Sequence, residues 1–125
     1  MYDKVLVLNV LNLVIHSVQI VLERFEPVKS VNDFTDNPAG LEKLDAICMQ
    51  LFAIGEGLKN IDKISNGTLL LKYPQIDWKG AKAMRDIISH HYFEVDAEVI
   101  YDVCLNKLPT LKSVLIQIKK DIEKA

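Results

Sequence analysis

The sequence predicts an all-α protein, an up-down bundle of four long helices and one or two short ones. Apolar residues recur every three or four positions along most of the 125 residues, and no alternating run bounded by turn residues indicates a strand. Half of the residues are apolar, while only four are proline and five are glycine, as is typical of a compact globular chain. We therefore expect a single domain over residues 1–125, since a chain of this length can build one stable core.

The first half of the chain predicts two long helices. The first is expected from Tyr2 to Phe25, ending before Pro27, because proline fits poorly inside a helix. After a polar connector, Asn37 followed by Pro38 is a typical helix start, with a side-chain cap and then proline at the first helical position. An apolar stripe then follows a helix of about six turns. Its members are Leu41, Leu44, Ile47, Leu51, Ile54, Leu58 and Ile61.

The second half predicts shorter elements. A short helix is expected between the Asn66-Gly67 turn and Pro74. Asp77 is placed to cap a helix over residues 78–92, and Asp96 to cap another over residues 97–105. The last helix begins at residues 108–109. Its expected inner residues are Leu111, Val114, Leu115 and Ile118.

Charge and composition restrict the classes of function. A formal net charge of −2 argues against binding nucleic acid by bulk charge, so a phosphate contact needs a local basic patch. Asn9, Asn12 and His16 interrupt the apolar N-terminal stretch, which favours a soluble cytoplasmic protein without a membrane partner over a signal or membrane segment. Cys48 and Cys104 lie within apolar helical patterns and are expected to be buried thiols in a reducing compartment.

The stretch RDIISHHYF, residues 85–93, is the candidate site. Its polar side chains share one arc of a regular helix with two lysines that precede them. Counted from Arg85, at about 100° per residue, Lys82 lies at about 60°, Asp86 at about 100°, Lys79 at about 120° and His90 at about 140°. Ser89 and Tyr92 lie closest to Arg85 on the same count, whereas His91 falls on the apolar arc, where packing is its expected role.

This arc has the groups that phosphodiester chemistry needs. A guanidinium holds a phosphate with paired hydrogen bonds, and an imidazole moves protons near neutral pH, so Arg85 and His90 suffice for RNA cleavage through the 2′-hydroxyl without a metal. Lys79 and Lys82 are candidate phosphate contacts, and Asp86, one turn before His90, can fix its tautomer. Because Arg85 and His90 diverge by about 140°, we expect a homodimer that brings two such helices together.

Simpler interpretations of the same residues stay open. A row of basic residues on a helix is more often a solvated face than a catalytic one. Glu56 is either a buried ion-pair partner of Arg85 or an exposed residue. A zinc site is not expected, because the adjacent histidines at 90 and 91 diverge by about 100° and no further ligand stands at suitable spacing. Ser89 has no evident triad that would make it a nucleophile.

The spacing Arg85-x4-His90-x-Tyr92 resembles the signature of the HepT-like toxins of the HEPN superfamily. Further segments occur in the family's order: NDF, IGEGLK, YPQIDW, VDAEVIYDV and LPTLK. The resemblance covers nearly the whole chain from about residue 30. It implies a HEPN-like helical fold and a dimeric, metal-independent endoribonuclease without a cofactor. Such an enzyme acts as the toxin of a bacterial toxin–antitoxin pair, and its antitoxin is a minimal nucleotidyltransferase.

The resemblance also implies roles for single residues. Arg85 and His90 correspond to the catalytic pair, Asp86 to the polar position after the arginine, and Tyr92 to the tyrosine that the antitoxin adenylylates. Ser89 is expected to be a supporting residue, because it lies near Arg85 on the helix. The chain departs from the family twice, with Asp86 where asparagine is common and His91 where an acidic residue is common. The alternative is a non-catalytic module that binds RNA or a nucleotidyltransferase, as other HEPN-like bundles do.

Overall fold

The computed structural model describes residues 2–90 and 95–125, and all regular elements in these ranges are helical. In chain order they are α1 (Lys4–Phe25), α2 (Asn32–Thr35), α3 (Pro38–Ile64), the 3₁₀ turn η1 (Leu70–Lys72), α4 (Trp78–His90), α5 (Ala97–Asp102), the π-helical segment η3 (Val103–Lys107) and α6 (Leu108–Lys124). The all-α prediction is confirmed, with α1, α3, α4 and α6 as the long helices. The predicted connector before Asn37 contains the short helix α2.

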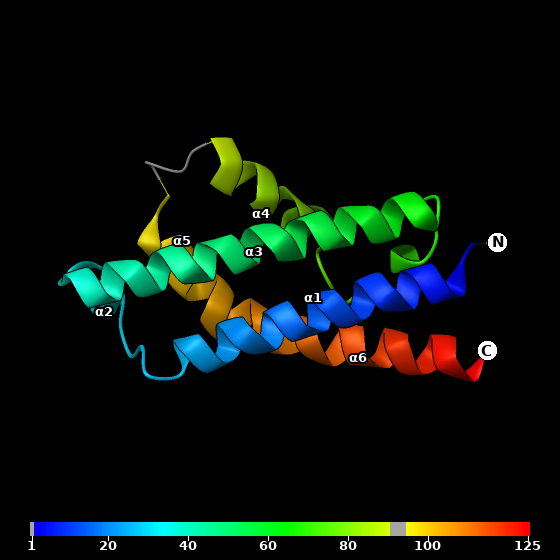
Figure 1. Ribbon diagram of the computed structural model, residues 1–125, viewed down its shortest axis with the longest axis horizontal. Helices are drawn as coiled ribbons and strands as arrows, with labels where there is room; N and C mark the ends of the chain where they lie inside the picture. The colour runs from blue at the N-terminus through cyan, green and yellow to red at the C-terminus, as the bar shows by residue number, and fades with distance from the viewer. Residues whose placement is uncertain (1, 91–94) are drawn as a thin grey trace.

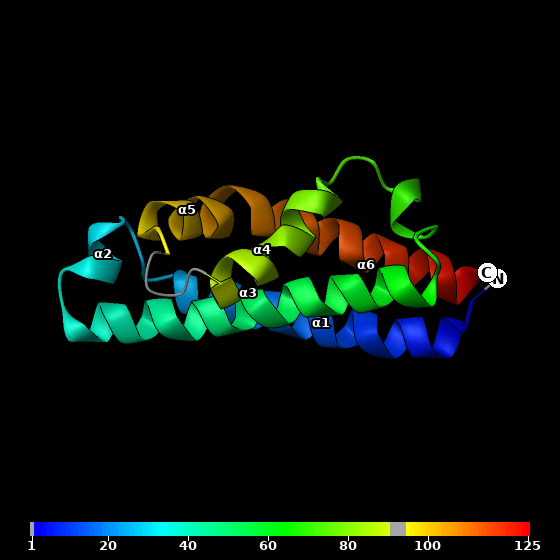
Figure 2. The ribbon, with the colours of Figure 1, turned by 90° about the horizontal axis from the view of Figure 1, so that it is seen from above.

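The long helices run in alternating directions along the chain (Figure 1). Helices α1, α3 and α6 lie along the long axis of the molecule, and the two ends of the chain are at the same end of it. Helix α4 lies over α3 and is inclined to it, as the view from above shows (Figure 2). Helix α1 packs against both α3 and α6, and α4 packs against α3. Helix α3 is therefore held between α1 on one side and α4 on the other.

The helix starts follow the capping residues of the sequence. The carboxylates of Asp3, Asp77 and Asp96 and the side-chain carbonyl of Asn37 each accept a hydrogen bond from a main-chain N–H two or three residues further on. These bonds satisfy N–H groups that have no partner inside the helix. The first helix begins at Lys4 rather than at the expected Tyr2, because Asp3 occupies the capping position.

The predicted apolar stripe of α3 enters the core, except at its start. Its buried members are Ile47, Leu51, Ile54, Leu58 and Ile61. Leu41 is 47% exposed, which differs from the prediction. The reason lies one residue earlier, where Gly40 faces the main chain of α2 so closely that a Cβ would clash with the carbonyl oxygen of Asp33. Leu41 is rotated by about 100° from that contact and turns away from it.

Helix α5 does not continue regularly to residue 105 as predicted. It passes into the π-helical segment η3, which leads directly into α6. A side-chain hydrogen bond spans this wider turn, from the amide of Asn106 to the carboxylate of Asp102, at 2.7 Å. A single extra residue within a helix leaves no distinct signature in an apolar pattern, so the sequence did not indicate this segment.

Helix α1 is long and apolar enough to cross a membrane by length and composition, because an 18-residue stretch of it has a mean hydropathy of 2.2. In the structure one side of it packs into the core. The buried residues are Val7, Leu11, Val14, Val18, Val21 and Phe25. Both cysteines are free and buried, as predicted. Burial raises the pKa of Cys48 to about 11 and that of Cys104 to about 12, so both thiols are protonated and unreactive at neutral pH.

Candidate active site

Two glycines in the segment IGEG set the distance between α3 and its neighbours. A Cβ on Gly55 would lie 2.8 Å from the Cβ of Arg85 in α4, closer than real Cβ contacts. A Cβ on Gly57 would clash with the side chain of Val14 in α1. Both glycines therefore allow close helix packing, and the first of them brings the backbone of Arg85 directly against α3.

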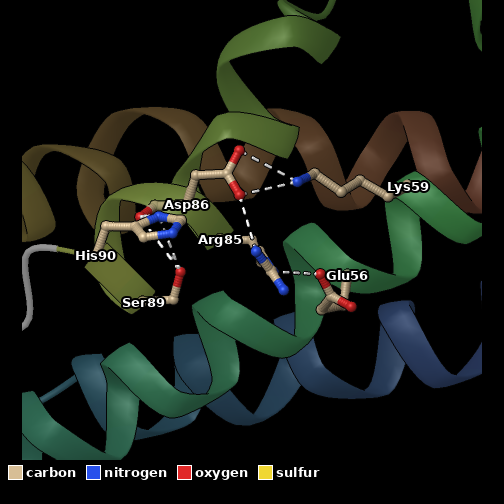
Figure 3. Close-up of polar contacts among 6 residues, drawn as sticks. All are labelled: Glu56, Lys59, Arg85, Asp86, Ser89 and His90. Carbon is tan, nitrogen blue, oxygen red and sulfur yellow. Dashed lines mark hydrogen bonds and ion pairs between the residues drawn. The ribbon is translucent and has the colours of Figure 1, made fainter.

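The side chain of Arg85 lies between two carboxylates (Figure 3). Its Nε is 2.6 Å from Oε1 of Glu56, and its Nη1 donates to Oδ1 of Asp86 at 3.0 Å. Nε has no well-aligned hydrogen-bond partner among the described residues, so its contact with Glu56 is chiefly electrostatic. The guanidinium carbon also lies 5.4 Å from the centre of the Phe52 ring, within cation–π range. Asp86 first, and then Glu56, raise the pKa of Arg85 above its usual value.

Lys59 of α3 completes this group of charges. Its ammonium donates to both oxygens of Asp86, at 3.0 and 3.2 Å. The hydrogen bond from Lys59, followed by the one from Arg85, lowers the pKa of Asp86 below its usual value. Asp86 is therefore a carboxylate at neutral pH, with one cation from α3 and one from its own helix. Glu56 is an ion-pair partner of Arg85, and with 44% of its side chain exposed it is not a buried one.

A further ion pair joins the same two helices, between Lys82 of α4 and Asp62 of α3. Lys82 and Arg85, the cations of α4 that lie against α3, are thus each paired with an acidic residue of that helix. The expected basic patch is therefore largely balanced in charge, because α3 supplies acidic groups opposite it. Lys79 lies on the exposed start of α4.

His90 is held by the main chain of Asp86. Its Nδ1 lies 3.0 Å from the carbonyl oxygen of Asp86 and 3.4 Å from Oγ of Ser89 (Figure 3). A carbonyl oxygen only accepts hydrogen bonds, so we assign the proton to Nδ1, which leaves the lone pair of Nε2 as a proton acceptor. Asp86 thus contacts His90 through its main-chain carbonyl, whereas the sequence predicted that its polar side chain would fix the tautomer.

The structure connects Arg85 and His90 through Asp86. No hydrogen bond joins the two directly within the described residues, which agrees with their divergence around the helix. Ser89 lies beside His90, and its hydroxyl is 3.4 Å from the carbonyl oxygen of Asp86. Residues 91–94 lie outside the described ranges, so the expected proximity of Tyr92 to Arg85 stays a prediction, as does the packing of His91.

Sequence reasoning missed the contributions of Phe52, Lys59 and Asp62 from α3. These residues stand at helical spacing with Glu56, so the pattern placed them on one side of the helix. It could not indicate that this side faces α4, because the contact depends on how the two helices pack.

Two other observations complete the description of this region. Within residues 2–90 and 95–125, no group of three or more His, Cys, Asp or Glu side chains could hold a metal ion. A cavity of about 500 Å³ lies between α3, the start of α4 and the η3–α6 region, and it is lined by none of Arg85, Asp86, Ser89 or His90. A smaller cavity of about 360 Å³ reaches Ser89.

Comparison with known proteins identifies the family. Residues 14–118 match the family described as ribonuclease HepT-like. The chain belongs to the HepT-like ribonuclease family. The resemblance suggested by the spacing of Arg85 and His90 is therefore confirmed, and the all-α bundle agrees with it.

Individual relatives of this HepT-like chain come from several organisms. A protein of Methanocaldococcus jannaschii named as a candidate RNase is 36% identical over 104 residues, covering 78% of this chain and 83% of the relative. A candidate RNase of Caldanaerobacter subterraneus is 28% identical over 111 residues, covering 89% of each chain. A protein of Thermococcus cleftensis named as a candidate HepT ribonuclease is 32% identical over 75 residues, covering 60% of this chain and 64% of the relative. No solved structure matches the chain significantly.

Proposed function

We propose that this HepT-like protein is a metal-independent endoribonuclease that acts in the cytoplasm as the toxin of a toxin–antitoxin pair. The observation that carries the proposal is the double role of Asp86 on α4. Its carboxylate holds Arg85, and its main-chain carbonyl holds His90 in the tautomer of a proton acceptor. Because the chain belongs to a family of ribonucleases, RNA cleavage is the reaction that such an arginine–histidine pair would catalyse.

In the proposed reaction the 2′-hydroxyl of a ribose attacks the adjacent phosphorus. Nε2 of His90 takes the proton of that hydroxyl while the new O2′–P bond forms. The P–O5′ bond breaks, and the leaving 5′-oxygen takes a proton from a second imidazole. Arg85 stabilises the negative charge that builds up on the phosphate oxygens. The products are a 2′,3′-cyclic phosphate and a 5′-hydroxyl, and no metal or cofactor takes part.

The second imidazole requires a second copy of the chain. One copy of the chain supplies a single His90, and among the described residues Arg85 is connected to it only through Asp86. A two-fold homodimer with two α4 helices facing each other would place both pairs around one phosphate. Lys79, exposed at the start of α4, and Lys82 beside it would hold flanking phosphates, while Ser89 supports the ring of His90.

The proposed antitoxin is a nucleotidyltransferase that adenylylates Tyr92. A nucleotide on this tyrosine would place a phosphate near Arg85 and fill the substrate site, which inhibits by mimicking RNA. Mass spectrometry after incubation with the antitoxin and ATP checks this directly. An adduct on Tyr92 that coincides with loss of RNA cleavage is the expected result, and an unmodified tyrosine in an inactivated protein contradicts it.

A second function, a non-catalytic module that binds RNA or a nucleotidyltransferase, is favoured by one observation. The acidic residues Glu56 and Asp62 neutralise the cations opposite them, which suits a surface that does not need to hold a scissile phosphate. A phosphate that binds Arg85 must share or displace these carboxylate contacts.

Cleavage of labelled RNA by the purified protein in EDTA separates the two functions. The wild type is expected to leave 2′,3′-cyclic phosphate ends, and His90→Ala is expected to be inactive. His16→Ala is the matched control, because His16 is also an exposed histidine but lies on α1. Cleavage that survives in His90→Ala, or that is absent from unmodified wild type on several RNAs, would overturn the ribonuclease proposal.

A further inference from the structure

The smaller cavity, of about 360 Å³, lies between the N-terminal half of α3 and the end of α4. Its volume is within the range of about 300–1,000 Å³ typical of small-molecule sites. The residues that line it are Asp45, Cys48, Met49, Phe52, Ile88 and Ser89. Cys48 and Ile88 are buried and Phe52 is half-buried, so they form an apolar floor, while Met49, with 66% of its surface exposed, stands at the opening.

This cavity adjoins both members of the candidate catalytic pair. Ser89 lines it and is the direct neighbour of His90, with the two side chains together at the end of α4 (Figure 3). On the opposite wall, the ring of Phe52 also carries the guanidinium of Arg85, at 5.4 Å. A molecule in the cavity would therefore lie next to any phosphate that contacts Arg85 and His90.

The lining indicates which part of an RNA fits. None of the described residues that line the cavity is a cation, so none of them would neutralise a phosphate group there. A flat, uncharged ring fits better. The thioether of Met49 and the ring of Phe52 can contact its faces, and the hydroxyl of Ser89 can contact its polar edge.

We propose that this cavity binds the base of a nucleotide that flanks the scissile phosphate. The proposal rests on the proposed ribonuclease function and adds to it a base-binding subsite formed by Met49, Phe52 and Ser89. The base anchors the nucleotide, and its phosphate then extends toward Arg85. Binding through a base restricts cleavage to single-stranded RNA, because a paired and stacked base is not free to enter the cavity.

Binding to two ligands in the inactive His90→Ala protein tests the subsite without cleavage. One ligand is a short single-stranded RNA of mixed sequence, and the other is a ribose-phosphate chain of the same length without bases. Met49→Ala, added to this protein, is expected to weaken binding of the RNA by about fivefold and to leave binding of the abasic chain unchanged. Met49→Leu, which keeps the apolar contact, should restore binding of the RNA.

Leu13→Ala is the matched control, because Leu13 is similarly exposed but lies on α1. It should change neither affinity. Equal weakening of both ligands by Met49→Ala, or no weakening of either, would overturn the subsite. A change of oligomeric state in Met49→Ala with no change in base dependence would overturn it as well, since the cavity would then belong to an interface between copies.

This experiment separates the subsite from the function on which it rests. If wild-type protein does not cleave RNA but the Met49-dependent preference for bases is present, the ribonuclease proposal fails and the base site stands. If wild-type protein cleaves RNA but shows no such preference, the base site fails and the ribonuclease proposal stands.

Discussion

Gly55 and Arg85 touch across the contact between α3 and α4. A methyl group at position 55 would lie 2.8 Å from the Cβ of Arg85 and 3.0 Å from its main-chain nitrogen. The backbone of Arg85 cannot give way without moving α4, because both atoms belong to the rigid part of the residue. The position of the guanidinium therefore depends on the absence of a side chain on α3.

Gly55→Ala is expected to lower the rate of RNA cleavage per folded molecule as well as the stability of the protein. The added methyl pushes α4 outward by a few tenths of an ångström or more and moves Arg85 away from Glu56. Overpacking of this kind costs about 1–3 kcal/mol of unfolding free energy. Urea unfolding and the rate of RNA cleavage measure the two effects.

Gly57→Ala is the control for this prediction. Its methyl would clash with Val14 of α1, on the side of α3 away from Arg85. It should lower stability by a similar amount while the cleavage rate of the folded fraction stays near that of wild type. Equal loss of cleavage per folded molecule in both variants would show that Gly55 has no special effect on Arg85.

Glu56→Gln is expected to strengthen RNA binding. The carboxylate of Glu56 competes with phosphate for Arg85, and the amide keeps its shape but not its charge. We expect an increase in affinity of about fivefold or less, because the pair is partly exposed and screened by salt. Fluorescence anisotropy in the His90→Ala background, at two salt concentrations, measures it. Glu42→Gln makes the same charge change at an exposed site of α3, and an equal gain there would attribute the effect to net charge alone.

The ion pair between Lys59 and Asp86 predicts a pH dependence of stability. Because the pKa of Asp86 is lowered in the folded protein, its contribution to stability is present at neutral pH. It is lost as the pH falls from about 4, the usual value for an aspartate, through the lowered pKa. Lys59→Met removes the largest cause of the lowered pKa, so Asp86 should titrate at a higher pH, as NMR of its carboxyl carbon can measure.

Lys63→Met is the control for the titration, because Lys63 is an exposed lysine of the same helix. It should leave the titration of Asp86 near that of wild type. A pKa of Asp86 that is the same in Lys59→Met and wild type would mean that Arg85 alone lowers it.

Phe34→Ala is expected to destabilise the end of the bundle that holds α2. The ring of Phe34 is fully buried, with its centre 6.2 Å from that of Phe25 and 6.5 Å from that of Tyr101. Its loss should cost about 3–5 kcal/mol of unfolding free energy. Urea unfolding checks this against Leu41→Ala, which removes a half-exposed side chain nearby. Similar losses in both variants would contradict the role of Phe34 as a core residue.

Much of the fold could be predicted because its signals are local. The caps at Asp77 and Asp96 act within three residues of their own position, and the apolar stripe of α3 repeats with the helix itself. The π-helical segment after Asp102 was not predicted, since one additional residue in a turn does not change which residues are apolar. Leu41 was wrongly expected to be buried, because its surroundings depend on where α2 packs.

The sequence by itself determined the class of the fold, the caps of its helices and the positions of the candidate arginine and histidine, because each of these depends on residue type and near-neighbour spacing. Only the tertiary structure decided that Glu56 and Lys59 face Arg85 and Asp86, and that His90 is held by a carbonyl rather than a carboxylate. The physical reason is that helical spacing specifies which side chains share a face, whereas packing specifies what that face meets. At the candidate site this packing is set by Gly55, where two helices approach closely enough for their charges to pair.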